Sequence, residues 1–562
     1  MSLMSMRRKM ASKKTITIIL WVLIVVFLVG VALWSVPNRG ALNSDNSNKS
    51  HYSGPDSADA VATVNGDNIT VGEMNDMYND MVSKSQMPKN FESTVGTRAQ
   101  AFKDLVTRKL VQQALKKYGL DVDDGYLRQN ARDYCTVQLA ELRQQAQKQA
   151  EMQKQNAKPD DKNKPKSADE LYQDQLSSFM RQQGGTPPDK ITDEAFTNFF
   201  VDDYLMKQMA EQFADNGRMC LLGSQMIKQL PVDPLTEDFM KKWNTQEVRG
   251  QLLFVSAKKQ DADSLKKALA DAQKYHDQIA KDPSQFTKLA QANNSMYTRG
   301  FATMGWYQAE TPMLPMMASY LLFSSKPGEL SNVTLISSSI GGQGEIGYGF
   351  VLVDKSRERS DPGAKDVKWD SNKKNLMLKT TQLFQTSMGE GYQLYLHATA
   401  TVVPKRHEIA VYLDEQNGET AKADEERKLA IDQDKNLSEE VKASFSYRLA
   451  TSTAVKQDPK QCIPLLMNAL PYAGEQTSKL HYELGVCYEQ TKENDRAKEQ
   501  FDNAESLAEI MKDQQTMKDI RAEYVKLNET AGVSKIDDWM KKNPAPANPR
   551  GGMGNIPINM GR

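Results

Sequence analysis

Histidine and cysteine, which often bind metals or act as nucleophiles, are few in this chain of 562 residues, and they are widely separated. The histidines and cysteines are His51, His276, His397, His407, His481, Cys135, Cys220, Cys462 and Cys487. They do not stand at the short spacings of metal sites or redox motifs. The glycine cluster at 341–344 lies where a hairpin turn is expected, without a following helix to receive a phosphate. We therefore expect no metal and no cofactor.

Five short motifs between residues 247 and 353 suggest a different chemistry. They are EVRGQLLFV (247–255), FTKLA (286–290), MGWY (304–307), KPGELS (326–331) and YGFVLV (348–353). In this order they resemble the parvulin family of peptidyl-prolyl isomerases, and KPGELS is the most specific of them. The resemblance implies a small α/β domain over residues 241–359, inserted into an otherwise helical body.

Parvulin chemistry needs polar groups that this chain lacks at the family's positions. An X-Pro bond isomerises unaided in roughly 10 to 100 s, and catalysis requires an apolar slot for proline and polar groups that favour the twisted imide. The resemblance places Leu252 and Gly349 where the family has its two active-site histidines. The third polar position of the family falls near Asn294, Ser295 or Met296. We therefore predict no catalytic residues.

The apolar slot is better preserved than the polar set. The resemblance places the remnant of its walls at Met304, Leu314, Ala318 and Phe323, with Ala318 where an aromatic residue is usual. His276 is the single histidine of the segment, and its position in the helical stretch DAQKYHDQIA indicates a solvated helix position. We interpret the domain as a parvulin fold retained for binding or architecture. An active isomerase that works by desolvation and shape alone is the alternative.

An uncharged apolar run at residues 15–34, TITIILWVLIVVFLVGVALW, is long enough to cross a membrane. Five basic residues precede it in segment 1–14, and only Arg39 follows closely. The positive-inside rule therefore predicts a cytoplasmic N-terminus, one span, and a bulk that is periplasmic or otherwise extracytoplasmic. A cleaved signal peptide is the alternative, but the run exceeds a usual apolar core and no clear A-x-A site follows. We expect an uncleaved anchor in the inner (cytoplasmic) membrane.

A polar linker at 35–57 leads into a compact module. A strand at 60–64, an NG turn, a TVGE capping box and the amphipathic segment AFKDLVTRKLVQQALKKYGLDV (101–122) follow one another. This pattern resembles the N-terminal chaperone domain of the SurA, PrsA and PpiD family. The resemblance implies such a domain over 58–240, completed by a helix within 360–415 that returns after the parvulin-like insertion.

The C-terminal part has a different periodicity. Seven residues stand at the positions that define a tetratricopeptide repeat: His481, Leu484, Gly485, Tyr488, Ala497, Phe501 and Ala504. We predict a helical repeat region over 436–543 and a disordered tail over 544–562. Buried, unpaired thiols are our default interpretation of the four cysteines, and a pairing of Cys462 with Cys487 in an oxidising compartment stays open.

Lysine plus arginine and aspartate plus glutamate each number 72, so the zero net charge does not favour a nucleic-acid partner. We expect an α+β protein with one transmembrane helix, a SurA-like chaperone domain, an inserted parvulin-like domain and C-terminal tetratricopeptide repeats. The whole resembles the PpiD chaperones, joined to repeats like those of the YfgM family.

That resemblance implies a holdase or foldase beside the SecYEG translocon, with unfolded or nascent secreted polypeptides as clients. We expect the client surface to be an apolar groove between the N-terminal domain and helix 366–397. The tetratricopeptide face is expected to bind a peptide or protein ligand. A scaffold that recruits envelope proteins through that face is a further alternative.

Overall fold

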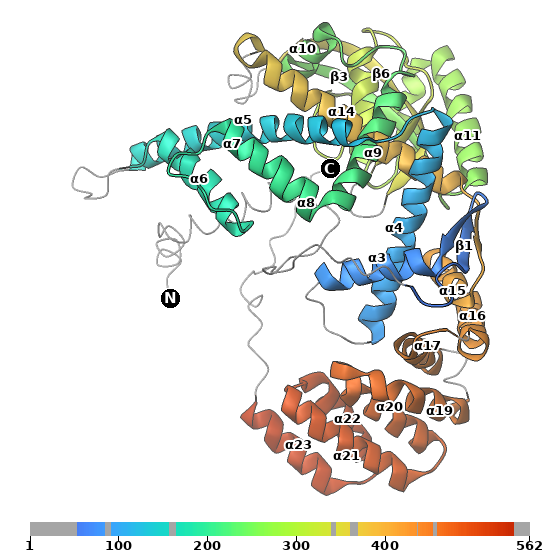
Figure 1. Cartoon of the computed structure of the whole chain (residues 1–562). Coiled ribbons are helices and arrows are strands. Elements are labelled where there is room, and N and C mark those ends of the chain that lie inside the picture. Colours follow the sequence, from blue (N-terminus) through green and yellow to red (C-terminus); the bar gives the residue numbers. More distant parts are fainter. Residues whose placement is uncertain are drawn as a thin grey trace. The chain divides into compact units, whose positions relative to one another are not determined.

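We describe the chain from a computed structural model (Figure 1), which places residues 53–84, 91–156, 165–338, 344–359, 369–434, 436–452 and 458–543. The predicted membrane span at 15–34, most of the predicted linker and the predicted tail lie outside these residues. Within the described ranges, no helix has the length and apolarity that a membrane crossing requires. These ranges form two compact units: unit 1 is 106–401, and unit 2 combines 53–105 with 402–543.

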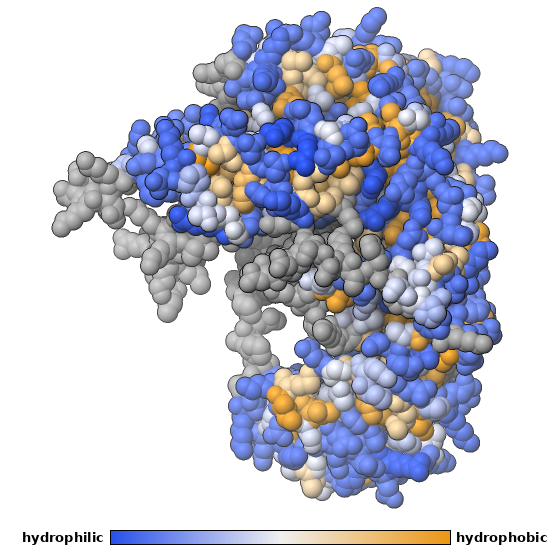
Figure 2. Space-filling model, viewed as in Figure 1, coloured by the Kyte–Doolittle hydropathy of each residue, from blue (hydrophilic) through white to orange (hydrophobic). Residues whose placement is uncertain are grey.

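Helices make up most of the described structure, and two small antiparallel sheets accompany them. The strand orders are β2-β1-β7 in unit 2 and β4-β3-β6-β5 in unit 1. This composition confirms the α+β class. Figure 2 shows hydrophilic residues over most of one face of the molecule, with apolar residues reaching the surface among them.

The N-terminal elements of unit 2 form a small sheet with two helices. They are β1 (Ala60–Val64), β2 (Asp67–Thr70), α3 (Val71–Lys84) and the first part of α4 (Phe91–Lys117). The predicted NG turn is present, because Asn65 and Gly66 adopt φ angles of 49° and 95°. The predicted capping box also forms, since Thr70 N donates to Glu73 Oε2 at 2.8 Å and Glu73 N donates to Thr70 Oγ1 at 3.2 Å.

Strand β7 (Val402–Pro404) completes this sheet by pairing with β1. A buried ion pair joins the same part of the chain, because Arg98 Nε of α4 donates to Glu408 Oε1 at 2.6 Å and Tyr412 OH donates to the same oxygen at 2.7 Å. Burial alone would raise the pKa of Glu408, but the charge and hydrogen bond of Arg98 lower it below its ordinary value. The N-terminal sheet and the C-terminal helices therefore form one unit.

Consecutive helices in the rest of unit 2 pack as hairpins. Their bounds are α15 (His407–Gln416), α16 (Thr420–Gln433), α17 (Glu439–Thr451), α19 (Pro459–Ala469), α20 (Thr477–Gln490), α21 (Asn494–Met511), α22 (Gln514–Lys526) and α23 (Thr530–Lys542). Two 3₁₀ turns, η6 (Leu470–Tyr472) and η7 (Gly474–Gln476), join α19 to α20. Two of these helices pack closely, because a Cβ on Gly485 of α20 would collide with the ring of Phe501 of α21. The hairpins begin with α15, upstream of residue 436.

Unit 1 begins with the second part of α4 and the helices that follow it, from α5 to α9. Its elements are α5 (Asp124–Asn156), α6 (Ala168–Gln182), α7 (Asp193–Asn198), the π-helix η1 (Phe199–Leu205), α8 (Met206–Gln208) and α9 (Ala210–Ile227). Residues 183–192 interrupt the helices of this part. Gly184 has a φ of 78° there, and Pro187 and Pro188 cannot continue a helix.

The parvulin-like segment follows with its own sheet. Its elements are α10 (Glu237–Thr245), β3 (Gln246–Ser256), α11 (Ala262–Lys281), η2 (Pro283–Gln285), α12 (Phe286–Asn293), η3 (Arg299–Phe301), β4 (Gly305–Tyr307), α13 (Met316–Ser324), β5 (Thr334–Ser338) and β6 (Glu345–Glu358). Helices α11 and α12 cover one face of the sheet, where Ile279 and Phe286 pack with Leu253 and Phe350.

Helix α14 (Trp369–Thr399) confirms the predicted helix at 366–397 and packs closely on α9. The approach requires glycine on both helices. A Cβ on Gly223 of α9 would collide with the carbonyl oxygen of Gln385, and one on Gly389 of α14 with that of Met219. The returning helix is therefore fixed against α9 by backbone contact rather than by long side chains.

Candidate functional site

Strand pairing places Leu252 and Gly349, the two positions where the parvulin resemblance expects histidines, on one face of the parvulin-like sheet. In the antiparallel register of β3 and β6, Leu252 lies opposite Val351, and Phe254 lies opposite Gly349. Residues opposite each other, and residues two apart on a strand, share a face. Leu252, Phe254, Val351 and Gly349 therefore lie together, on the face that α11 and α12 leave uncovered.

Apolar side chains fill this face. Leu252 is 1% exposed, and it belongs to the same hydrophobic core as three predicted slot residues, Leu314, Ala318 and Phe323. The fourth, Met304, is half-buried and directly precedes β4. The structure thus brings three of the four predicted slot residues into one core with Leu252.

Two helices from outside the parvulin-like sheet pack on that core. Trp243 of α10 contacts Phe323 with ring centroids 5.2 Å apart, and Phe384 of α14 lies 4.8 Å from Trp243. Phe239 and Tyr320 complete the aromatic cluster, with Phe239 5.9 Å from Tyr320. The family motifs did not predict that α10 and α14 cover the sheet. The spacing of Phe239 and Trp243, four residues apart, does indicate an apolar helix face.

Gly349 leaves no space for a side chain. A Cβ at this position would lie 2.5 Å from the carbonyl oxygen of Leu253 and 2.9 Å from Cδ1 of Ile336. The neighbouring strands β3 and β5 therefore occupy the volume that a histidine would need.

The third polar position is used for structure. Asn294 is 4% exposed, its Nδ2 donates to the carbonyl oxygens of Leu252 and Thr298 at 2.9 Å each, and its Oδ1 accepts from Phe254 N at 2.9 Å. The neighbouring Ser295 hydroxyl is bonded to Thr298 Oγ1 at 3.0 Å. An amide with three hydrogen bonds braces β3 and has no free group for catalysis.

The histidines are divided among different elements, as the sequence indicated. His276 is on α11, on the other face of the sheet, and meets the ring of Phe350 edge-on at 5.1 Å. His397, His407 and His481 lie near Thr107, Glu426 and Gln500 respectively. His51 lies outside the described residues. In the ranges that the structure describes, groups of three or more metal-type ligands are absent.

A cavity of about 660 Å³ lies in unit 1, away from the predicted slot. Met180 and Gly185 line it at the end of α6, and Phe199, Asp202 and Lys207 line it on η1 and α8. The four predicted slot residues do not border it. Sequence reasoning missed this hollow, because the π-helix at its wall has hydrogen bonds between residues five apart rather than four and does not follow the α-helical period.

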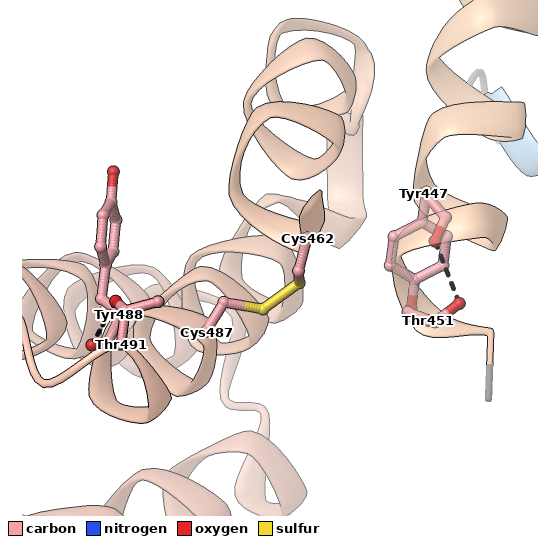
Figure 3. Close-up of a disulfide and its surroundings, with 6 residues drawn as sticks. All are labelled: Tyr447, Thr451, Cys462, Cys487, Tyr488 and Thr491. Atoms are coloured by element: carbon pink, nitrogen blue, oxygen red, sulfur yellow. Dashed lines mark hydrogen bonds between the residues drawn. A yellow bond between two sulfur atoms is a disulfide. The ribbon is translucent and has the colours of Figure 1, made fainter. Parts of the chain in front are cut away.

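Two cysteines are joined by a disulfide. Cys462 of α19 is bonded to Cys487 of α20, with Cα atoms 6.3 Å apart, as Figure 3 shows. Our default interpretation of four unpaired thiols was therefore wrong for these two, because the fold brings their helices side by side. Cys135 is buried and free, and Cys220 is half-buried and free.

Comparison with known proteins identifies one region. Residues 3–160 match the family described as the SurA-like N-terminal domain. Curated proteins give no match to the chain. Similar solved structures include the foldase protein PrsA from Streptococcus pneumoniae strain Canada MDR_19A and the foldase protein PrsA from Lactococcus lactis. Each is 16% identical to this chain, and the match covers 64% of this chain and 99% of the other. The TM-score of 0.18 is too low for a structural argument. The N-terminal part of the chain is therefore SurA-like, and this likeness supports a chaperone or foldase.

Proposed function

We propose that this protein is a chaperone that holds unfolded segments of secreted polypeptides, and that its parvulin-like domain serves as architecture rather than as an isomerase. The observation that carries the second part is the occupied sheet face. Leu252 stands in an apolar core there, and Gly349 has no room for a side chain. Polar groups that would favour a twisted imide are not supplied at these positions.

The client surface of this proposal lies on unit 1, around the core that α9, α13 and α14 share. Half-buried apolar side chains pack at its edge, and five of them are Tyr118, Met219, Met316, Met317 and Tyr392. Methionine has a flexible thioether chain, and tyrosine presents a ring with a polar tip, so both suit weak contacts with many sequences. Apolar residues also reach the surface in Figure 2.

Membrane attachment through residues 15–34 belongs to the same proposal. An uncleaved span would confine the chaperone to the extracytoplasmic side of the membrane, where polypeptides leave the SecYEG translocon. Tethering raises the effective concentration of the surface for emerging chains, so weak contacts suffice. Carbonate extraction of membranes from cells with the full chain, or with 15–34 deleted, tests the attachment; release of both forms alike would contradict it.

Two assays on the full chain test the chaperone function. The first follows light scattering as a chemically unfolded secreted protein is diluted into buffer. We expect the full chain to suppress scattering, and Met219→Ser with Met316→Ser to weaken this effect. The matched control is Met152→Ser, which changes a half-exposed methionine on α5. If all variants suppress scattering equally, the assignment of the client surface is wrong. If the full chain leaves scattering unchanged, the chaperone function is wrong.

The second assay measures cis–trans exchange of a proline peptide by NMR. We expect the exchange rate of the peptide alone, because Leu252 and Gly349 supply no polar side chain at the positions where the family has its histidines. Catalysed exchange would favour the isomerase alternative. A protein that neither suppresses scattering nor catalyses exchange would be better explained as a scaffold that acts through its helical hairpins.

A further inference from the structure

One side chain from outside the hairpins belongs to their hydrophobic core. Phe91, at the beginning of α4, is fully buried and packs in the cluster that α17, α19, α20 and the later helices form. Its ring centroid lies 5.4 Å from that of Tyr447 on α17. An aromatic ring is thus inserted into the hairpin stack from a helix far away in the sequence.

Polar groups of the hairpins lie near Glu92, the residue that follows Phe91. Gln476 Nε2 donates a hydrogen bond to Glu92 Oε2 at 2.8 Å. The ammonium group of Lys479 lies 5.7 Å above the ring of Tyr447. A hydrogen bond with Tyr447 raises the pKa of Lys479 above its ordinary value, and the negative charge of Glu92 adds to this. The hairpins therefore contact the ring of Phe91 through Tyr447 and the carboxylate of Glu92 through Gln476.

The helices that supply Tyr447 and Lys479 both pack on α19, and a disulfide links one of them to it. Tyr447 comes from α17, Gln476 from η7 and Lys479 from α20, and both α17 and α20 pack on α19. The disulfide between Cys462 and Cys487 fixes α20 to α19 (Figure 3). The disulfide restrains α20 against α19 independently of Phe91.

One acceptor at this place is not used by the chain itself. The Oε1 atom of Gln476 is buried and accepts no hydrogen bond from the residues that the structure describes. A buried carbonyl without a donor is unfavourable, so this position favours a ligand that brings an N–H group.

We propose that α17, η7 and α20 form a peptide-binding site for an aromatic residue followed by an acidic residue, and that the chain's own Phe91 and Glu92 occupy it in cis. A segment of another polypeptide with this pair would bind when the first turn of α4 leaves. If the site is free in about one molecule in ten, the apparent dissociation constant of such a segment is about tenfold weaker than the intrinsic one.

Fluorescence anisotropy with the full chain tests this proposal. The probe is a labelled peptide of residues 91–105, FESTVGTRAQAFKDL. The control peptide has alanine in place of its first residue, Phe91. Phe91→Ala in the protein should empty the site, so we expect the peptide to bind this variant about tenfold or more tightly than wild type. The control peptide should bind neither form.

A charge exchange keeps the test decisive if Phe91→Ala unfolds. Glu92→Lys in the protein removes the cis carboxylate without changing the core, and should raise peptide affinity above that of wild type. Lys479→Glu should then prefer a peptide with lysine in place of its glutamate. Equal binding of the peptide to wild type and Glu92→Lys, or no binding to either, would overturn the proposal. Binding without dependence on the aromatic residue would overturn it as well.

Discussion

Putting histidine back at positions 252 and 349 should fail to restore an isomerase and should destabilise the protein. At Gly349 the new Cβ would lie 2.5 Å from the carbonyl oxygen of Leu253 and 2.9 Å from Cδ1 of Ile336. Overpacking of this kind costs about 1 to 3 kcal/mol. At Leu252, which is 1% exposed, an imidazole would bury a polar group without a partner, at a cost of about 1 to 3 kcal/mol.

Together these changes cost about 2 to 6 kcal/mol, a large part of the 5 to 15 kcal/mol that usually stabilises a folded protein. Urea unfolding followed by circular dichroism measures this loss, and NMR exchange of a proline peptide measures activity. The matched control is Gly300→Ala in the same domain, where an added Cβ meets no atom within 4 Å. A double histidine variant that is as stable as wild type and catalyses exchange would refute the reasoning.

Three further predictions concern the two units. Arg98→Met should cost about 3 to 5 kcal/mol because it leaves the buried carboxylate of Glu408 without its cation. Arg98 lowers the pKa of Glu408 in wild type, whereas burial without Arg98 raises it, so the difference between variant and wild type in urea unfolding should be largest near neutral pH and shrink as the pH falls. Cys462→Ser opens a disulfide between residues 25 positions apart and should cost about 3 kcal/mol in thermal unfolding, whereas Cys220→Ser, which changes a free thiol, should cost less than about 1 kcal/mol. Gly223→Val should separate α9 from α14 and lower the melting temperature by several degrees, and an unchanged value would contradict the close approach.

Local features of the fold could be predicted well from the sequence. Strand β1 has the predicted bounds 60–64, and the capping box at Thr70 and Glu73 forms as expected. These features depend on residues within a few positions of one another, so the sequence contains the whole cause.

Features that depend on distant packing could not be predicted. The cover of the sheet face by Trp243 and Phe384 requires two helices that are separated by the whole parvulin-like segment. The pairing of Cys462 with Cys487 depends on the approach of α19 to α20, and spacing alone does not fix that distance. The motifs thus located the candidate site, whereas the packing that fills its sheet face could not be predicted from them.

The order of synthesis gives the pairing of β1 with β7 a further meaning. Val64 pairs with Val402, so the ribosome must add roughly 340 residues after β1 before its partner exists, which takes roughly 20 to 70 s at ordinary translation rates. During that time one edge of β1 has no strand beside it, and exposed edges invite pairing with other chains. The N-terminal sheet is therefore completed late, and a newly made copy of this protein is itself at risk of aggregation until its last third has appeared.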